Sequence, residues 1–346
     1  MRIAVIGATG NVGTSVVRAL GADDAVTSIL AIARRRPASQ PPKTEFASLD
    51  ITRDELVPHL EGADGVIHLA WLIQPSHDEA TLHRTNIDGS QRVLDAVAAA
   101  NVPALVVASS IGAYSPRADH SPVDESWPCE GIPASWYSRQ KVELERRLDR
   151  LEERNPELRV VRLRPAITTK RESASEQRRL FAGPFLPNRL LRPGWIPFVP
   201  DVPGLSLQLV HADDLGDAYR RVALADVRGA FNVAADPVLD PAAIARVLGT
   251  RTLRFPERLL RGAARGSWLA RLQPTSPDWI DLALGVPVLD SSRIRSELGW
   301  TPTRAADETL RDVVEGLRDG AGGETPPLLP GRRLAEFRAG VGGDQI

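Results

Sequence analysis

The first thirteen residues, MRIAVIGATGNVG, constrain the fold of this chain more than any other stretch. Their apolar run, Ile3–Ile6, is typical of a strand buried on both faces. Glycines follow at Gly7, Gly10 and Gly13, and apolar residues then recur at helical spacing. This order predicts a dinucleotide-binding loop: the first glycine permits a tight turn, the second a close approach to a pyrophosphate, and the third helix–strand packing. Unpaired N–H groups at the helix start would face the anion.

Strands and helices are predicted to alternate through the first half of the chain. Apolar runs predict further strands at residues 28–33, 44–49, 64–70, 104–108 and 158–163. Helical patterns lie between them, the longest at about 78–100 and 135–154. Such alternation is typical of the α/β class with a doubly wound parallel Rossmann sheet and right-handed crossovers.

Beyond Arg164 this alternation stops, and proline, glycine, arginine and aromatic residues become frequent. We predict a Rossmann domain over residues 1–164, to whose sheet residues 205–235 return. Residues 165–204 and 236–318 are predicted to form a smaller, mostly helical C-terminal substrate-binding lobe. The remainder, 319–346, is rich in glycine, proline and arginine, and we expect it to be a mobile tail.

Composition excludes several classes of function. The formal net charge of −1 gives no overall attraction to nucleic acid or to an anionic membrane. A single cysteine, Cys129, permits no intrachain disulfide, and the scattered histidines have no metal-ligand spacing. We find neither a signal peptide at the start nor an apolar run of the ~20 residues that a membrane helix needs. A cytoplasmic protein without a metal is therefore expected.

Tyr137 and Lys141 lie four residues apart in a predicted helix, which places both side chains on one helix face. An unperturbed tyrosine has a pKa of about 10, so it exchanges protons poorly at neutral pH. A lysine ammonium one turn away, together with a cationic nicotinamide, would lower that pKa. Ser110 ends the strand at 104–108, at the carboxyl edge where such sheets bind ligands. Its hydroxyl would hold a substrate oxygen beside the phenol.

These motifs together resemble an extended short-chain dehydrogenase/reductase of the NAD-dependent epimerase/dehydratase family. The matching segments are GATGNVG (Gly7–Gly13), LDI around Asp50, HLA (His68–Ala70), TNIDGS around Asn86, SSIGAY (Ser109–Tyr114), YSRQK (Tyr137–Lys141) and RLRPA around Arg164. The resemblance implies a catalytic Ser110 rather than Ser109, acting with Tyr137 and Lys141. Asn86 is a further candidate, which would order a helix and hold a proton-relay water.

The resemblance also implies a set of cofactor-binding residues: Gly7, Thr9, Gly10, Asn11, Val12, Gly13, Arg34, Arg35, Asp50, Ile51, Leu69, Ala70, Tyr137, Lys141 and Arg164. Relatives that prefer NAD usually carry an acidic residue at the end of the second strand, which binds the ribose 2′-hydroxyl. Here Ala33 stands there, followed by Arg34 and Arg35. Because guanidinium groups can grip a 2′-phosphate, we predict a preference for NADP(H), with NAD(H) as the alternative.

The predicted function is NAD(P)-dependent hydride transfer between nicotinamide and a carbonyl or alcohol carbon of a small molecule. Two alternatives stay open: a nucleotide-sugar epimerase or dehydratase, and a non-catalytic NADP(H)-binding sensor or scaffold. Four arginines could meet a sugar-linked diphosphate, namely Arg178, Arg179, Arg189 and Arg192. Five aromatic residues are candidates for the substrate pocket: Trp136, Phe181, Phe185, Trp195 and Phe198. A homodimer is a further expectation, because the long helices resemble dimer surfaces of the family.

Overall fold

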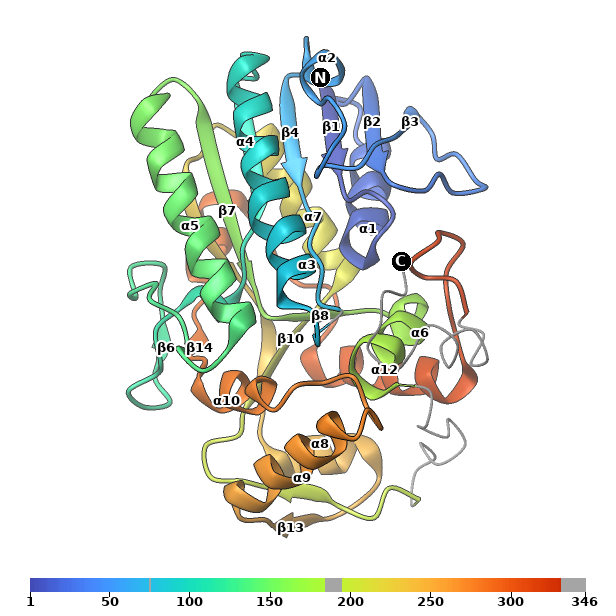
Figure 1. The fold of residues 1–346 in the computed structure, drawn as a ribbon, viewed down its shortest axis with the longest axis vertical. Coiled ribbons are helices and arrows are strands. Elements are labelled where there is room, and N and C mark those ends of the chain that lie inside the picture. Colours follow the sequence, from blue (N-terminus) through green and yellow to red (C-terminus); the bar gives the residue numbers. More distant parts are fainter. Residues whose placement is uncertain (75, 184–194, 331–346) are drawn as a thin grey trace.

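The computed structural model describes residues 1–74, 76–183 and 195–330. Its centre is a seven-stranded sheet in the order β11–β7–β5–β4–β1–β2–β3, in which every neighbouring pair is parallel (Figure 1). The strands are Arg2–Ile6 (β1), Ser28–Ala33 (β2), Thr44–Ser48 (β3), Gly65–His68 (β4), Ala104–Ala108 (β5), Arg159–Pro165 (β7) and Gly229–Val233 (β11). The doubly wound α/β prediction is confirmed.

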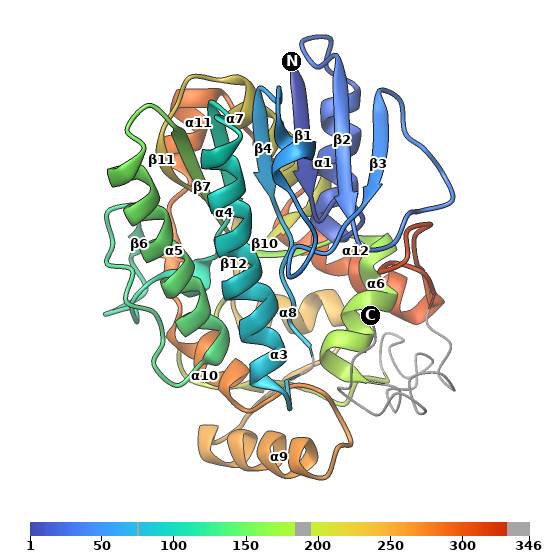
Figure 2. The ribbon, with the colours of Figure 1, turned by 45° about the horizontal axis from the view of Figure 1, so that its top comes forward.

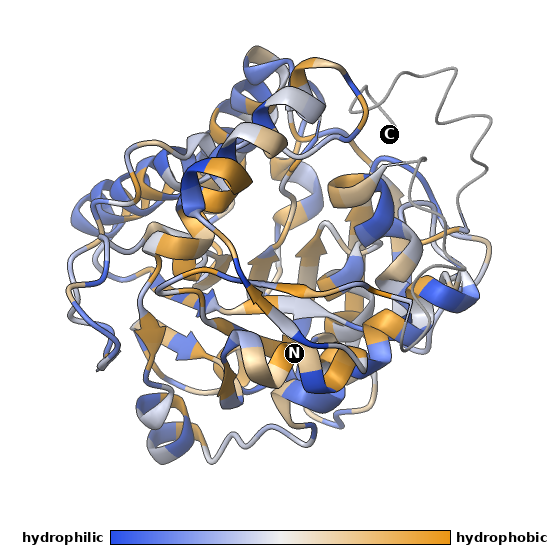
Figure 3. Ribbon diagram, turned by 90° about the horizontal axis from the view of Figure 1, so that it is seen from below, coloured by the Kyte–Doolittle hydropathy of each residue, from blue (hydrophilic) through white to orange (hydrophobic). Residues whose placement is uncertain are grey.

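Helices cover both faces of this sheet, as Figures 1 and 2 show. One face carries α1 (Asn11–Gly21), α7 (Ala212–Leu224) and α11 (Ser292–Leu298), and the other carries α2 (Val57–Leu60), α4 (Ser90–Ala99) and α5 (Trp136–Arg154). In β1, Ile3 and Val5 pack toward the first group, and Ala4 and Ile6 toward the second. The central strands β1, β2, β4 and β5 are mostly apolar because helices cover both of their faces, and Figure 3 shows this apolar centre.

Smaller sheets extend from the carboxyl edge of the central one. A three-stranded sheet joins β8 (Ile167–Thr169), β10 (Leu207–His211) and β12 (Ala235–Leu239); two-stranded sheets pair β9 (Val199–Asp201) with β13 (Thr252–Arg254) and β6 (Pro122–Val123) with β14 (Val288–Leu289). The sequence predicted that residues 205–235 return to the central sheet. Of the two strands in this segment that precede β12, β11 joins that sheet and β10 does not. β10 pairs with β8 and β12 instead.

The C-terminal half is mostly helical, as expected. It holds α6 (Ala174–Gln177), α8 (Pro241–Leu248), α9 (Glu257–Leu269), α10 (Asp278–Gly285) and α12 (Ala306–Asp319). In Figure 1, α8, α9 and α10 lie below the sheet, beyond the carboxyl ends of its strands. The domain boundaries themselves stay a prediction. Among the described helices, none has the length and apolar character that crossing a membrane requires.

Residues 320–330, the described part of the predicted mobile tail, follow α12 and contact other parts of the chain. Ser175 donates its backbone N–H to Ala321 O at 3.0 Å, and Gly323 N–H bonds Leu328 O at 2.8 Å. Leu328 is buried. This part of the predicted tail is therefore packed against the start of α6, and residues 331–346 lie outside the described structure.

Candidate active site

The glycine loop between β1 and α1 has the geometry that a dinucleotide pyrophosphate needs. Gly7 has a φ of +87°, and a Cβ there would lie 2.7 Å from Ala70 N. A Cβ on Gly13 would lie 2.2 Å from Gly7 O, so only glycine lets α1 pack this closely. Gly10, in contrast, has open space beside it, with its nearest neighbour at 3.7 Å. The three glycines therefore have the local geometry that the three predicted roles require.

The start of α1 is also free to meet an anion. Gly10 is the N-cap residue, and no side chain caps the helix there. Its first N–H groups therefore point outward with the positive end of the helix dipole. The Asn11 side chain turns aside and donates Nδ2 to Thr168 O at 2.9 Å. The loop thus fits the diphosphate of an NAD(P) molecule.

The other predicted cofactor residues lie along the same edge of the sheet. Backbone bonds align the strand ends, since Gly7 N–H donates to Ile32 O at 2.9 Å and Leu69 N–H to Ile6 O at 2.8 Å. Val12, Arg34, Arg35, Asp50, Ile51, Leu69 and Ala70 follow or flank these ends. The structure thereby brings the predicted cofactor residues of β1 to β4 to one edge.

Arg34 lies beside the Asp50 carboxylate at this edge. Burial would raise the pKa of Asp50, but hydrogen bonds from Thr52 and the charge of Arg34 hold it below its ordinary value. Asp50 Oδ1 accepts from Thr52 N at 2.9 Å and from Thr52 Oγ1 at 2.7 Å. Arg35 is exposed. Two guanidinium groups therefore stand where a relative that prefers NAD would have a carboxylate.

Ser110 and Tyr137 meet at the carboxyl end of β5. Ser110 caps a short turn, Ile111–Ala113, by accepting the Gly112 N–H at 3.0 Å, and it lies close enough to Tyr137 to lower the pKa of that phenol. Tyr137 lies in the first turn of α5, whose N-cap is Ser135. One turn later, Lys141 Nζ donates to Ala108 O at 2.8 Å. The three predicted catalytic residues are thus brought together.

Burial dominates the protonation of this group. It raises the pKa of Tyr137 to about 12, against a smaller lowering by Ser110. Burial also lowers the pKa of Lys141 to about 7, and Glu145 opposes this. Lys141 Nζ lies 3.5 Å from the centroid of the Trp71 ring and 5.8 Å from that of Tyr137. The predicted lowering of the tyrosine pKa requires a bound cationic nicotinamide as well as Lys141, so it stays a prediction.

Asn86 orders the segment that follows β4. It lies in a π-helical segment, Arg84–Gly89, between α3 (Glu79–His83) and α4. Its Oδ1 accepts Leu72 N–H at 2.7 Å, and its Nδ2 donates to Leu72 O and to Gln140 Oε1, each at 2.8 Å. The side chain is fully buried. Asn86 therefore ties the loop that carries Trp71 to the helix that carries Lys141.

Arg164, a predicted cofactor residue, is buried and bonds other protein groups in this structure. Its Nε donates to Glu145 Oε1 at 2.9 Å, its Nη2 to Glu145 Oε2 at 3.1 Å, and its Nη1 to Tyr114 Oη at 3.0 Å. The same carboxylate accepts from Ser109 Oγ and from Arg162. Ser109 thus belongs to a buried ion cluster behind the site, while Ser110 faces Tyr137.

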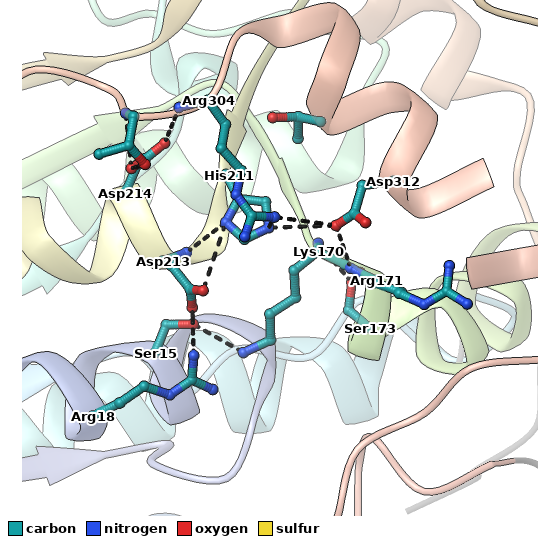
Figure 4. A network of polar contacts seen from close by, with 12 residues as sticks. Ser15, Arg18, Lys170, Arg171, Ser173, His211, Asp213, Asp214, Arg304 and Asp312 are labelled. Atoms are coloured by element: carbon teal, nitrogen blue, oxygen red, sulfur yellow. Dashed lines mark hydrogen bonds and ion pairs between the residues drawn. The ribbon is translucent and has the colours of Figure 1, made fainter. Parts of the chain in front are cut away.

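A second buried network surrounds Lys170, behind the glycine loop (Figure 4). Lys170 Nζ donates to Thr14 Oγ1 at 2.7 Å and to Ser15 Oγ at 2.9 Å, and Ser15 in turn donates to Asp213 Oδ1 at 2.6 Å. Burial lowers the pKa of Lys170 to about 8. His211 caps α7 by accepting the Asp213 N–H at 3.2 Å. The network therefore fixes α1 against α7 and the C-terminal half.

The C-terminal segment reaches the glycine loop directly. Thr325 Oγ1 donates to Thr9 O at 2.7 Å, across 316 positions of sequence. Arg179 bonds the carbonyls of Pro327 and Leu329, which holds the segment on the other side. Thr9 is buried beneath it. The sequence around Thr325, a threonine followed by two prolines, contains no motif that predicts this contact.

The aromatic candidates divide into two groups. Trp136 and Phe181 lie near Tyr137, joined there by Trp71 and Trp279, which sequence reasoning missed. Trp71 could have been found, because it directly follows the HLA segment at a strand end. Trp195 is 61% exposed, and Phe198 stacks on Phe255. Phe185, Arg189 and Arg192 lie outside the described residues. Within the described residues, no group of side chains could hold a metal ion.

Known proteins resemble this chain in sequence. The model of the NAD dependent epimerase/dehydratase family matches residues 3–179. An uncharacterized protein of Mycobacterium tuberculosis is 28% identical over 336 residues, which cover 96% of this chain and 32% of that protein. The chain thus spans about a third of the length of the curated relatives that match it first. The L-arabinose 1-dehydrogenase (NAD(P)(+)) of Haloferax volcanii is 38% identical over 110 residues, 32% of this chain and 41% of that enzyme.

Solved structures resemble it in fold. The UDP-glucose 4-epimerase of Thermus thermophilus in complex with NAD superposes with a TM-score of 0.66 at 20% identity, over 92% of this chain and 99% of that one. The UDP-glucuronic acid 4-epimerase of Bacillus cereus in complex with NAD gives a TM-score of 0.66 at 16% identity, with the same coverage. At these identities the likeness concerns the fold.

Proposed function

Because the chain belongs to the NAD dependent epimerase/dehydratase family, we propose that it is an oxidoreductase of the extended short-chain type. It would transfer a hydride between a nicotinamide and a carbonyl or alcohol carbon of a small molecule. The observation that carries this proposal is the meeting of Ser110, Tyr137 and Lys141 at the carboxyl edge of the sheet, with Lys141 one helical turn from Tyr137.

The phenol of Tyr137 is suited to act as the proton donor in a carbonyl reduction. With a pKa of about 12, its phenol carries a proton at neutral pH and can donate it. A reduced nicotinamide, when bound, supplies the hydride. Ser110 would orient the carbonyl oxygen, and Tyr137 would give that oxygen its proton as the alcohol forms. Lys141, anchored on Ala108 O, would support the turn that carries both groups.

The test of this function is the consumption of NADPH by the purified protein with a broad panel of aldehydes and ketones. We expect the absorbance of NADPH to fall as alcohol forms in equal amount. Product that forms while NADPH stays constant would contradict net reduction and favour the epimerase or dehydratase reading. Cofactor binding without conversion of any compound in the panel would favour a sensor or scaffold.

We further propose that the cofactor is NADP(H), on the strength of Arg34 and Arg35. Replacing both by Ser is expected to raise the KM for NADPH roughly 10- to 100-fold and to leave the KM for NADH nearly unchanged, since hydrogen bonds to charged groups contribute about 1.5–3 kcal/mol. Steady-state kinetics with both cofactors measure this. Arg36→Ser is the matched control, because Arg36 donates to Gln40 instead. Equal changes for NADH and NADPH would contradict the proposal.

A further inference from the structure

The ring of Tyr137 lies within a cluster of aromatic side chains from four separate segments. Trp71 and Trp136 meet it edge-on, with ring centroids 6.1 and 6.0 Å away, and Trp279 lies tilted against it at 5.1 Å. Phe181 meets Trp279 edge-on at 5.1 Å. We call these four residues the aromatic cluster. In Figure 1, α10, which carries Trp279, lies below the end of α5 that carries Tyr137.

Three indole donors of this cluster have no acceptor. The Nε1–H groups of Trp71, Trp136 and Trp279 are all buried, and none has a hydrogen-bond partner within the described residues. An indole nitrogen can only donate, and buried donors in proteins are almost always paired. Three unpaired donors around one reacting group therefore indicate a ligand that carries oxygen acceptors.

Two of the four arginines that could meet a diphosphate lie in the described part of the chain, and both bond backbone carbonyls. Arg178 is buried and donates to Gly183 O at 3.0 Å, and Arg179 bonds the carbonyls of Pro327 and Leu329. The Lys141 ammonium is covered by the Trp71 face and Ala108 O. What surrounds the phenol is mainly flat, apolar ring surface with N–H donors.

We propose that the substrate is a planar, uncharged aryl aldehyde or ketone, whose binding is strengthened by further oxygen acceptors on the ring. This proposal rests on the proposed function. The aryl ring would pack on the aromatic cluster, and its oxygen substituents would accept from the indole N–H groups. The carbonyl carbon takes a hydride from NAD(P)H, forming a C–H bond, and the carbonyl oxygen takes the Tyr137 proton. The nicotinamide is oxidised and the carbonyl is reduced to an alcohol.

The test compares benzaldehyde with cyclohexanecarbaldehyde, which has the same carbon skeleton without the flat ring. We expect kcat/KM to be at least roughly tenfold higher for benzaldehyde, because each aromatic contact contributes a factor of a few to about ten. Benzaldehydes with methoxy or hydroxyl substituents should be better still. Trp279→Leu should lower the benzaldehyde-to-cyclohexanecarbaldehyde ratio roughly tenfold. Trp195→Leu, which removes a tryptophan that is 61% exposed, should leave the ratio unchanged.

A second variant separates the ring from its donor. Trp279→Phe keeps an aromatic face and removes the N–H, so it should retain the aryl preference and lose part of the gain from oxygen substituents. Equal kcat/KM for the two aldehydes, with NADPH consumed, would overturn the substrate class and leave the reductase function standing. If no carbonyl compound turns over, binding of the two aldehydes is measured by the quenching of tryptophan fluorescence. Selective binding of aryl aldehydes would support the proposed substrate class, and equal or no binding would overturn it.

Discussion

Replacing Tyr137 by Phe is expected to lower kcat for carbonyl reduction by about 10²- to 10⁴-fold, the range that general acid catalysis contributes. The substitution removes one hydroxyl and keeps the ring, so the contacts with Trp71, Trp136 and Trp279 remain. Cofactor affinity should change little, because the glycine loop is untouched. Steady-state kinetics of NADPH oxidation, with cofactor binding measured separately, check both parts.

Tyr219→Phe is the matched control for this substitution. Tyr219 is fully buried on α7, and its hydroxyl has no hydrogen-bond partner among the described residues. Removing that hydroxyl should leave turnover near the wild-type value. If Tyr137→Phe also keeps full turnover, the phenol is not the proton donor, and the proposed mechanism is wrong.

Replacing Glu145 by Gln is expected to cost about 3–5 kcal/mol of unfolding free energy, as removal of one partner from a buried ion pair does. The Glu145 side chain is 4% exposed and that of Arg164 is 6% exposed. Without the carboxylate, Arg164 keeps only neutral acceptors, Tyr114 and Glu125 O. Arg162 stays paired with Asp149 and Glu152. Denaturant unfolding measures the loss.

The control for this variant lies half a turn away on the same helix. Glu143 pairs with Arg147 at 2.9 Å near the surface, and Glu143→Gln should change stability by only about 0–1 kcal/mol. If Glu145→Gln also changed the free energy of unfolding by only about 0–1 kcal/mol, the buried ion cluster would contribute little to stability.

Glu145 also predicts a dependence of stability on pH. Burial would raise its pKa, but Arg164, Arg162 and Ser109 hold it below the ordinary value. The unfolded chain, with a carboxyl pKa of about 4.3, therefore takes up this proton first as pH falls. The contribution is complete above about pH 4.3 and is lost as pH falls through the folded-state pKa. Glu145→Gln should lack this acid-sensitive part of the unfolding curve.

The fold could be predicted because its signals are local. Ile3–Ile6 is buried on both faces, Gly7 adopts a positive φ, and Tyr137 and Lys141 share a helix face, as their spacing requires. Each of these facts depends on neighbours within a few positions of sequence. The catalytic group was predictable for the same reason, since strand ends meet at one edge of a parallel sheet.

What could not be predicted depends on partners that are distant in sequence. Arg164 lies near the carboxyl end of β7, where a cofactor role was reasonable, but it pairs with Glu145 of the preceding helix, α5. The pKa of Lys141 depends mainly on its burial, which its spacing from Tyr137 does not reveal. Trp279 reaches Tyr137 from a helix 142 positions later, with no motif around it.

The bond between Thr325 and Thr9 has a consequence for how the protein is made. The ribosome releases the glycine loop early, but the hydroxyl that bonds it is synthesised 316 residues later. A nascent chain can therefore pair its first strands long before this hydroxyl exists. The loop acquires this neighbour only once residue 325 has been synthesised, so a chain that stopped before it would have a complete central sheet and a glycine loop without this bond.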